Sequence, residues 1–233
     1  MSTVERSTPR PGPSPRPVDE THFVPDHLVE AFAVTDPDEV RRLKADREAT
    51  GLDRRDEMWE GMYVMSPSPN FEHQTISDQL WLVFWSVLGL AGGGVVIHDF
   101  NVSDRIEGWT ENYRIPDIAV YLSTNSSINR GTHMVGGPDL AVEILSEGDL
   151  ARKKLDFYAR IGTRELLLLD RHPWALELYR LADGRLDLVG VSTPDGPEFL
   201  TSTVLPLTLG LLAGEGRPTI ELSRTDGEQS WRI

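Results

Sequence analysis

Two apolar stretches of the sequence each contain a carboxylate where packing alone favours an apolar side chain. Asp117 follows Pro116 at the head of the stretch 115–122 (IPDIAVYL), and Glu143 lies in the middle of 139–146 (DLAVEILS). Burying an unpaired carboxylate costs several kcal/mol, so each needs a cation, hydrogen bonds or a raised pKa. If the two stretches are neighbouring strands, both carboxylates can converge on one divalent cation, which predicts a phosphoryl-transfer site. A structural pair between Glu143 and a nearby arginine is the alternative.

A lysine follows the second acidic stretch on a predicted helix at 151–162. Lys154 lies one residue before Leu155 and four before Tyr158, so we expect it to project toward the sheet. A lysine there can orient or deprotonate the attacking water and balance the charge that develops on a phosphate. Lys153 points about 100° away on a helix and is the lesser candidate. A solvated surface lysine is the alternative for both.

The composition limits the other chemistries that the protein can use. The chain has 233 residues, of which 39% are hydrophobic, enough for the core of one domain. It contains no cysteine, which excludes disulfides, thiolate nucleophiles and cysteine-bound metals. Its 37 acidic residues against 23 Lys and Arg give a formal charge of -14, so we expect weak non-specific affinity for DNA. A carboxylate-bound metal would bring its own positive charge to a phosphate.

The chain is predicted to comprise one domain with a segment at either end. Residues 1–22 are rich in proline and arginine and are expected to form a disordered arm. Residues 23–212 form the predicted domain, and 213–233 are expected to be an edge segment. No run approaches the roughly 20 apolar residues of a membrane span, and the amino terminus lacks a secretion signal. We therefore expect a cytoplasmic protein that does not contact membranes.

Helices and strands are predicted from periodicity and from capping and turn residues. A helix is expected from Thr35, capped by Thr35 with Asp38, to about Thr50. A hairpin over 57–65 should turn at Gly61. The remaining predictions are a helix over 71–90, strands over 95–100, 165–170, 175–181 and 185–191, and edge structure for 205–212 and 219–223.

This order of elements predicts an α/β or α+β fold with a mixed central sheet flanked by helices. The connections are too short for a doubly wound nucleotide-binding fold. The sequence also lacks the glycine patterns GxGxxG and GxxxxGK[ST] that cradle phosphates. Nucleotide binding is therefore not expected.

Several of these segments, taken in order, resemble one known family. They are EMWEGMYVMSPSPNFEHQ (57–74), RIPDIAVYL (114–122), DLAVEILSEGD (139–149), RKKLDFYARIGTRELLLLD (152–170) and ALELYRL (175–181). This series is similar to the Uma2 family of endonucleases, also called DUF820, which belongs to the PD-(D/E)XK restriction-endonuclease-like superfamily. The likeness extends from about residue 52 to residue 192.

The resemblance implies a Mg²⁺-dependent nuclease core in which Asp117 and Glu143 match the two acidic residues of the superfamily. The usual lysine, two residues after the second acid, is replaced here by Leu145, and its role carries over to Lys154 on the following helix. Glu57 matches an acidic residue of the family's YEL-x-x-G segment, where it can add a carboxylate or hold a metal-bound water. His73 matches a histidine for which capping or packing is the alternative to catalysis.

The sequence therefore predicts an endonuclease that hydrolyses DNA phosphodiester bonds. Asp117 and Glu143 are expected to hold Mg²⁺ or Mn²⁺, the carbonyl oxygen of Ile144 to complete the shell, and Lys154 to align the water. A homodimer is expected because two sites related by a two-fold axis suit the cutting of both strands. The alternative is a catalytically inactive nuclease-fold module that binds or regulates a protein partner.

Overall fold

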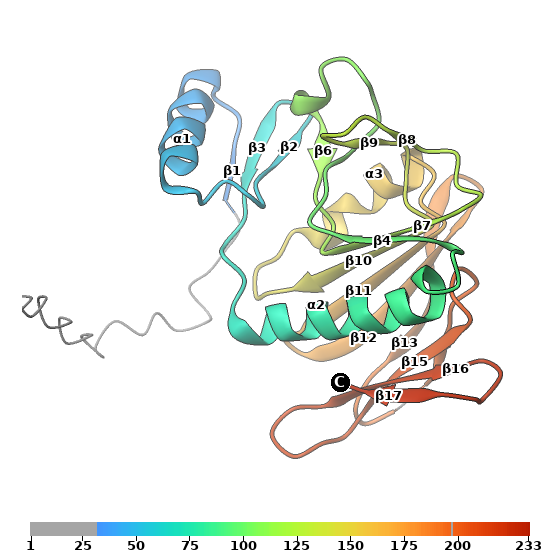
Figure 1. Ribbon diagram of the computed structural model, residues 1–233. Helices are drawn as coiled ribbons and strands as arrows, with labels where there is room; N and C mark the ends of the chain where they lie inside the picture. Colours follow the sequence, from blue (N-terminus) through green and yellow to red (C-terminus); the bar gives the residue numbers. More distant parts are fainter. Residues whose placement is uncertain (1–31, 197) are drawn as a thin grey trace, which may run out of the picture.

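A six-stranded mixed sheet forms the centre of the molecule (Figure 1). The computed structural model describes residues 32–196 and 198–233, so the predicted arm at 1–22 lies outside the described residues. β10 and β11 are parallel and the other neighbours are antiparallel, which confirms the predicted mixed sheet. In spatial order its strands are β13 (Arg185–Ser192), β12 (Trp174–Ala182), β11 (Glu165–Arg171), β10 (Leu140–Leu145), β7 (Ile118–Leu122) and β4 (Gly94–His98).

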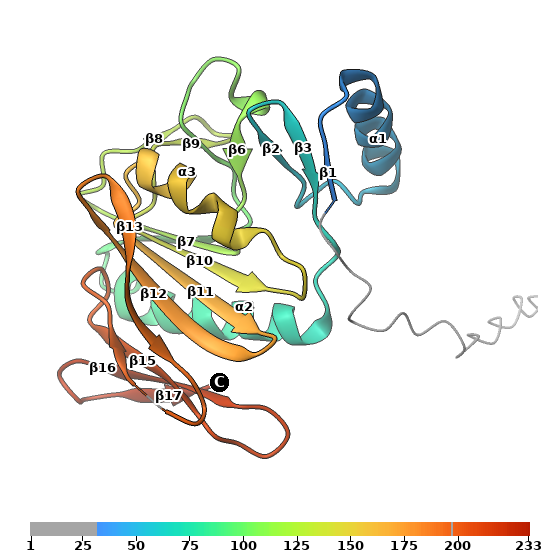
Figure 2. The same ribbon diagram turned by 180° about the vertical axis from the view of Figure 1, so that it is seen from behind.

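Helices cover both faces of this sheet, as predicted (Figures 1 and 2). The helix α2 (Phe71–Phe84) continues into a π-helical turn, η2 (Trp85–Gly89), and lies on one face. A 3-10 turn, η4 (Ala151–Lys154), leads into α3 (Leu155–Arg160) on the other face. The helix predicted over 151–162 is thus shorter and begins with a tighter turn.

The alternation of side chains along β10 decides which face receives its carboxylate. Val142 and Ile144 pack in the core beneath α2, whereas Ala141 and Leu145 pack with α3. Because successive side chains of a strand point to opposite faces, Glu143 points toward α3. The strand therefore presents this carboxylate to the element that carries Lys154.

A second sheet of seven short strands lies beside the central one and includes the predicted hairpin. The hairpin turns at Gly61, whose φ of 84° suits glycine. Helix α1 (Pro37–Thr50) packs against it, and its cap is Asp36 rather than the predicted Thr35, because the Asp36 carboxylate accepts from two backbone N–H groups. In order the strands are β1 (Phe32–Val34), β3 (Met62–Met65), β2 (Glu57–Trp59), β6 (Tyr113–Arg114), β5 (Val102–Ser103), β9 (Met134–Val135) and β8 (Ile128–Asn129), with a 3-10 turn η3 (Trp109–Glu111) before β6.

The carboxyl-terminal segments form a sheet of their own, which corrects the prediction of edge structure. Its strands are β14 (Leu200–Thr201), β15 (Leu207–Leu212), β16 (Thr219–Arg224) and β17 (Ser230–Arg232). The predicted division after residue 212 falls between β15 and β16, which pair along six residues. Ile220 and Leu222 share the main core with Leu80 of α2, because the apolar faces of these short strands have nowhere else to be buried.

Within the described residues, no helix is both long enough and apolar enough to span a bilayer.

Candidate active site

The pairing of β7 with β10 brings the two predicted carboxylates together. Val142 pairs with Ile118 in an antiparallel register. Continuing that register by one residue sets Glu143 opposite Asp117, and directly opposed residues of an antiparallel pair point to the same face. Both side chains are buried, at 5% and 6% exposure, and both line one cleft.

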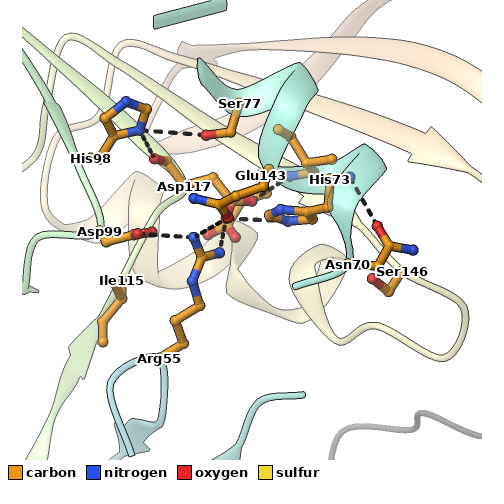
Figure 3. A network of polar contacts seen from close by, with 12 residues as sticks. Arg55, Asn70, His73, Ser77, His98, Asp99, Ile115, Asp117, Glu143 and Ser146 are labelled. Atoms are coloured by element: carbon orange, nitrogen blue, oxygen red, sulfur yellow. Dashed lines mark hydrogen bonds and ion pairs between the residues drawn. The ribbon is translucent and has the colours of Figure 1, made fainter. Parts of the chain in front are cut away.

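Asp117 is surrounded by hydrogen-bond donors and positive charge (Figure 3). Its Oδ1 accepts from an Arg55 guanidinium nitrogen at 2.6 Å and lies 3.3 Å from His73 Nε2, while its Oδ2 accepts from the backbone N–H of Ile144 at 2.7 Å. Burial by itself raises the pKa of Asp117, but His73, Arg55 and the Ile144 N–H outweigh it and lower the pKa to about 2. Asp117 is therefore ionised at neutral pH.

Glu143 has fewer compensating partners. Its Oε1 accepts from the Tyr158 hydroxyl at 2.6 Å, and Lys154 Nζ lies 3.0 Å from each of its oxygens. Burial raises the pKa of Glu143 to about 8, helped by the nearby Glu57 and Asp117 carboxylates and opposed by Lys154. The ionised form of Glu143 is thus short of positive charge.

Glu57 positions the lysine. Its Oε1 accepts from Lys154 Nζ at 2.8 Å and from the backbone N–H of Ile115 at 2.8 Å, while its Oε2 accepts from Trp59 Nε1 at 2.7 Å. Burial would lower the pKa of Lys154, but the carboxylates of Glu143, Glu57 and Asp149 raise it above its usual range. Lys154 is therefore a permanent ammonium, suited to orienting groups and balancing charge rather than to accepting a proton.

The composition of the cleft fits a divalent cation. With every carboxylate ionised, the lining has a formal excess of two negative charges, and the raised pKa of Glu143 reflects this excess; the charged residues are Glu57, Asp117, Glu143, Asp149, Arg55 and Lys154. Its free volume of about 60 Å³ has room for a cation with a few waters. Among the described residues no three acidic or imidazole groups converge as a complete ligand set. A magnesium-type site needs only one or two protein carboxylates, with waters filling the other positions.

The structure brings together all the residues predicted for the site. Lys154 is buried and Lys153 is exposed, in agreement with the predicted orientation. Asp149 accepts from the backbone N–H of Ala151 at 2.7 Å and so caps the turn that carries Lys154. Glu143 does not pair with an arginine, which was the alternative. Its cationic partner is Lys154, and the nearby Arg55 pairs with Asp117 instead.

Two contacts escape the sequence-based prediction. Arg55 reaches Asp117 across 62 positions of the chain, and no local pattern singles it out. The hydrogen bond from the Tyr158 hydroxyl to Glu143 is not predicted either. The sequence does contain one indication of the Tyr158 contact, which is its spacing from Lys154. Residues four apart on a helix lie on one side, and here both contact the Glu143 carboxylate.

Comparisons with known proteins identify the family and the fold. The family model described as "Uma2: Putative restriction endonuclease" matches residues 38–213. A crystal structure from Anabaena variabilis ATCC 29413, described as "a putative nuclease belonging to DUF820", superposes with a TM-score of 0.52 at 20% identity. The match covers 64% of this chain and 82% of that one and shows that the fold is the same. No curated protein matches the chain.

Proposed function

This chain belongs to the Uma2 family, and we propose that it is a divalent-metal-dependent endonuclease that hydrolyses DNA phosphodiester bonds. The observation that supports this proposal is the placement of Glu143 opposite Asp117 in a shared cleft, with the Lys154 ammonium 3.0 Å from both Glu143 oxygens. Neutralising any of the three would remove either a metal ligand or the adjacent positive charge.

Asp117 and Glu143 would hold Mg²⁺ or Mn²⁺, with the carbonyl oxygen of Ile144 as a further ligand. When bound, such a cation polarises the phosphate, activates water and stabilises the leaving oxygen. The donor set is made of oxygen atoms, which hard divalent cations prefer. The excess of carboxylates over arginine and lysine in the lining of the cleft supports a divalent cation.

The remaining residues orient these groups. The Lys154 ammonium faces the cleft and can donate to the attacking water or to a phosphate oxygen, where it stabilises developing negative charge. Glu57 fixes Lys154, and Glu57 is itself held by Trp59 and Ile115. The Tyr158 hydroxyl holds one oxygen of Glu143, so that its carboxylate keeps a single orientation. These contacts give the site the preorganisation that catalysis requires.

Plasmid nicking tests the proposal. The wild-type protein should nick supercoiled plasmid with Mg²⁺ or Mn²⁺ and stop when EDTA is added. Asp117→Asn, Glu143→Gln and Lys154→Met proteins should lose the nicking, whereas Asp187→Asn, at an exposed position of β13, should retain it. Nicking that persists in all three site variants, or in EDTA, would contradict the proposal.

A catalytically inactive module that binds a protein partner is the second candidate. One observation favours it: both carboxylates already form ion pairs without a metal. Asp117 pairs with Arg55, and Glu143 pairs with Lys154. Calorimetric titration with Mn²⁺ separates the two. A nuclease should bind Mn²⁺ and lose that binding in Asp117→Asn, whereas an inactive module need not bind metal.

The identity of the metal, the choice of DNA as substrate, the homodimer and the cytoplasmic location stay predictions. One further prediction follows from the net charge of -14: because phosphates repel an acidic protein, binding to DNA without metal should be weak.

A further inference from the structure

Arg55 lines both the cleft and a second, larger hollow. Figure 3 shows its polar contacts. One guanidinium nitrogen donates to Asp117 at 2.6 Å, and the other donates to Asp99 at 2.9 Å and to Gln74 at 3.3 Å. The side chain is only 18% exposed. A single arginine thus joins the proposed metal ligand to a carboxylate outside the metal site.

The two ends of this bridge are held by the fold. Asp56, the next residue after Arg55, accepts from Arg47 at 2.7 Å and from the backbone N–H of Ser66 at 2.9 Å, which fixes the chain where Arg55 begins. Asp99 follows β4 with a φ of 45°, a conformation that residues other than glycine rarely adopt. Such a conformation persists only where the surroundings enforce it. The backbone that carries Asp99 is therefore held in place, and its carboxylate gives Arg55 a second partner.

The bonding of Asp117 leaves little room for an additional cation. Its Oδ2 accepts from the Ile144 N–H, and its Oδ1 faces both Arg55 and His73. A carboxylate has about four lone-pair sites, and a divalent cation placed at Oδ1 would meet the guanidinium within a few ångströms in a partly buried cleft. Like charges repel strongly in such surroundings. A cation bound at Oδ1 therefore competes with Arg55 for that oxygen.

We propose that Arg55 is a displaceable counter-ion, which neutralises Asp117 in the metal-free protein and, when the divalent cation binds, releases Asp117 while it keeps its bonds to Asp99 and Gln74. This inference rests on the proposed function, since it concerns the same metal site. The space for the movement exists: the adjoining hollow of about 560 Å³ is lined by Arg55, Gln74 and Asp99 and shares Ser66 and Pro67 with the cleft. Arg55 thus keeps the site folded without metal and raises the concentration of metal needed to fill it.

Calorimetric titration of EDTA-stripped full-length protein with Mn²⁺ tests this role. In Arg55→Gln the competing charge is removed, so the Kd for Mn²⁺ should fall about fivefold. The matched control is Arg54→Gln, because Arg54 is exposed, lines the same hollow and has no carboxylate partner among the described residues. Its Kd should stay within about twofold of wild type.

The melting temperature gives a second readout that does not depend on activity. Without metal, Arg55→Gln should melt below wild type because Asp117 loses a partner, and saturating Mn²⁺ should close that gap. Arg55→Lys supplies a second variant should Arg55→Gln not fold: its single ammonium cannot bridge both carboxylates, so about a twofold fall in Kd is expected.

The outcomes separate this inference from the proposed function. If wild type binds Mn²⁺ and Arg55→Gln binds it equally or more weakly, or if Arg54→Gln tightens binding as much, the counter-ion role is wrong while the metal site stands. If neither wild type nor Arg55→Gln binds Mn²⁺ although both fold, the metal site and the counter-ion role both fail.

Discussion

Two buried glutamates on neighbouring strands have pKa values that are shifted in opposite directions. Glu165, at the start of β11, accepts from the hydroxyls of Ser202 and Thr203, from the Thr203 N–H and from Arg180, all within 3.0 Å. Burial raises the pKa of Glu165, but these donors outweigh it and lower the pKa. Glu143, on β10, has two partners and further carboxylates nearby, and its pKa is raised to about 8. Burial raises the pKa of both groups; donors outweigh it at Glu165, whereas at Glu143 the neighbouring carboxylates Glu57 and Asp117 add to it.

The contrast separates a structural carboxylate from a functional one. Glu165 ties the central sheet to the start of the carboxyl-terminal sheet through Ser202 and Thr203, which follow β14. Glu143 lies in a cleft with unmatched negative charge, which an incoming cation can satisfy. Groups whose environment shifts them away from their ordinary pKa concentrate at functional sites. We therefore expect Glu143 to matter for activity and Glu165 for stability.

The largest expected effect is on catalysis, in the variant Glu143→Gln. Loss of a metal ligand should reduce the nicking rate about 1,000-fold. The melting temperature in EDTA should change little, because the ionised form of Glu143 is poorly compensated. Initial rates of plasmid nicking and thermal melts of the same preparation check both parts. A large fall in melting temperature with activity preserved would reverse the assignment.

The next effect is on stability, in the variant Glu165→Gln. An amide has one acceptor oxygen where the carboxylate has two. It cannot accept hydrogen bonds from all the surrounding donors, so some of these donors are left buried without a partner. The free energy of unfolding should fall by about 3 kcal/mol, measured by urea denaturation. The nicking rate per folded molecule should match wild type. A stability equal to wild type would show that the Glu165 network is dispensable.

The pH dependence of stability sharpens the same comparison with a smaller effect. Because folding lowers the pKa of Glu165, its ionised form stabilises the protein above the ordinary glutamate pKa of 4.5. This stabilisation is lost as the pH falls from there through the lowered folded-state pKa. The difference in unfolding free energy between wild type and Glu165→Gln should be constant near neutrality and shrink below about pH 4.5. A difference that grows on acidification would contradict the lowered pKa.

The smallest expected effect comes from Tyr158→Phe. This change removes one hydrogen bond to Glu143 and leaves the ring that packs beneath the sheet. Loss of one hydrogen bond to a charged group should lower the nicking rate about tenfold. The variant Tyr179→Phe, which loses a comparable bond to Glu177 on β12, is the control and should keep the wild-type rate. Equal rates in the two variants would remove Tyr158 from the account of the site.

Much of the site could be predicted because it follows from local pattern. The carboxylates Asp117 and Glu143 interrupt apolar strands, and neighbouring strands bring such residues together. Lys154 and Tyr158 share a helical face four residues apart. These relations depend on the periodicity of strands and helices, which a single sequence displays.

Other features could not be predicted because they depend on long-range contacts. Arg55 meets Asp99 and Asp117 across 44 and 62 positions, and none of the three lies in a pattern that names its partner. The strands β15 and β16 are short, and their membership of a separate sheet is decided by pairing with each other and by burial against α2. The role of Glu57 likewise depends on Ile115 and Lys154, which lie 58 and 97 positions further along the chain.

A crystal structure of the protein soaked in Mn²⁺, with anomalous data collected at the manganese absorption edge, tests the central claim most directly. One anomalous peak is expected within bonding distance of the Asp117 and Glu143 carboxylates, with the Lys154 ammonium beside it. A well-soaked crystal with no peak between these two carboxylates, or with manganese bound only elsewhere, would contradict it.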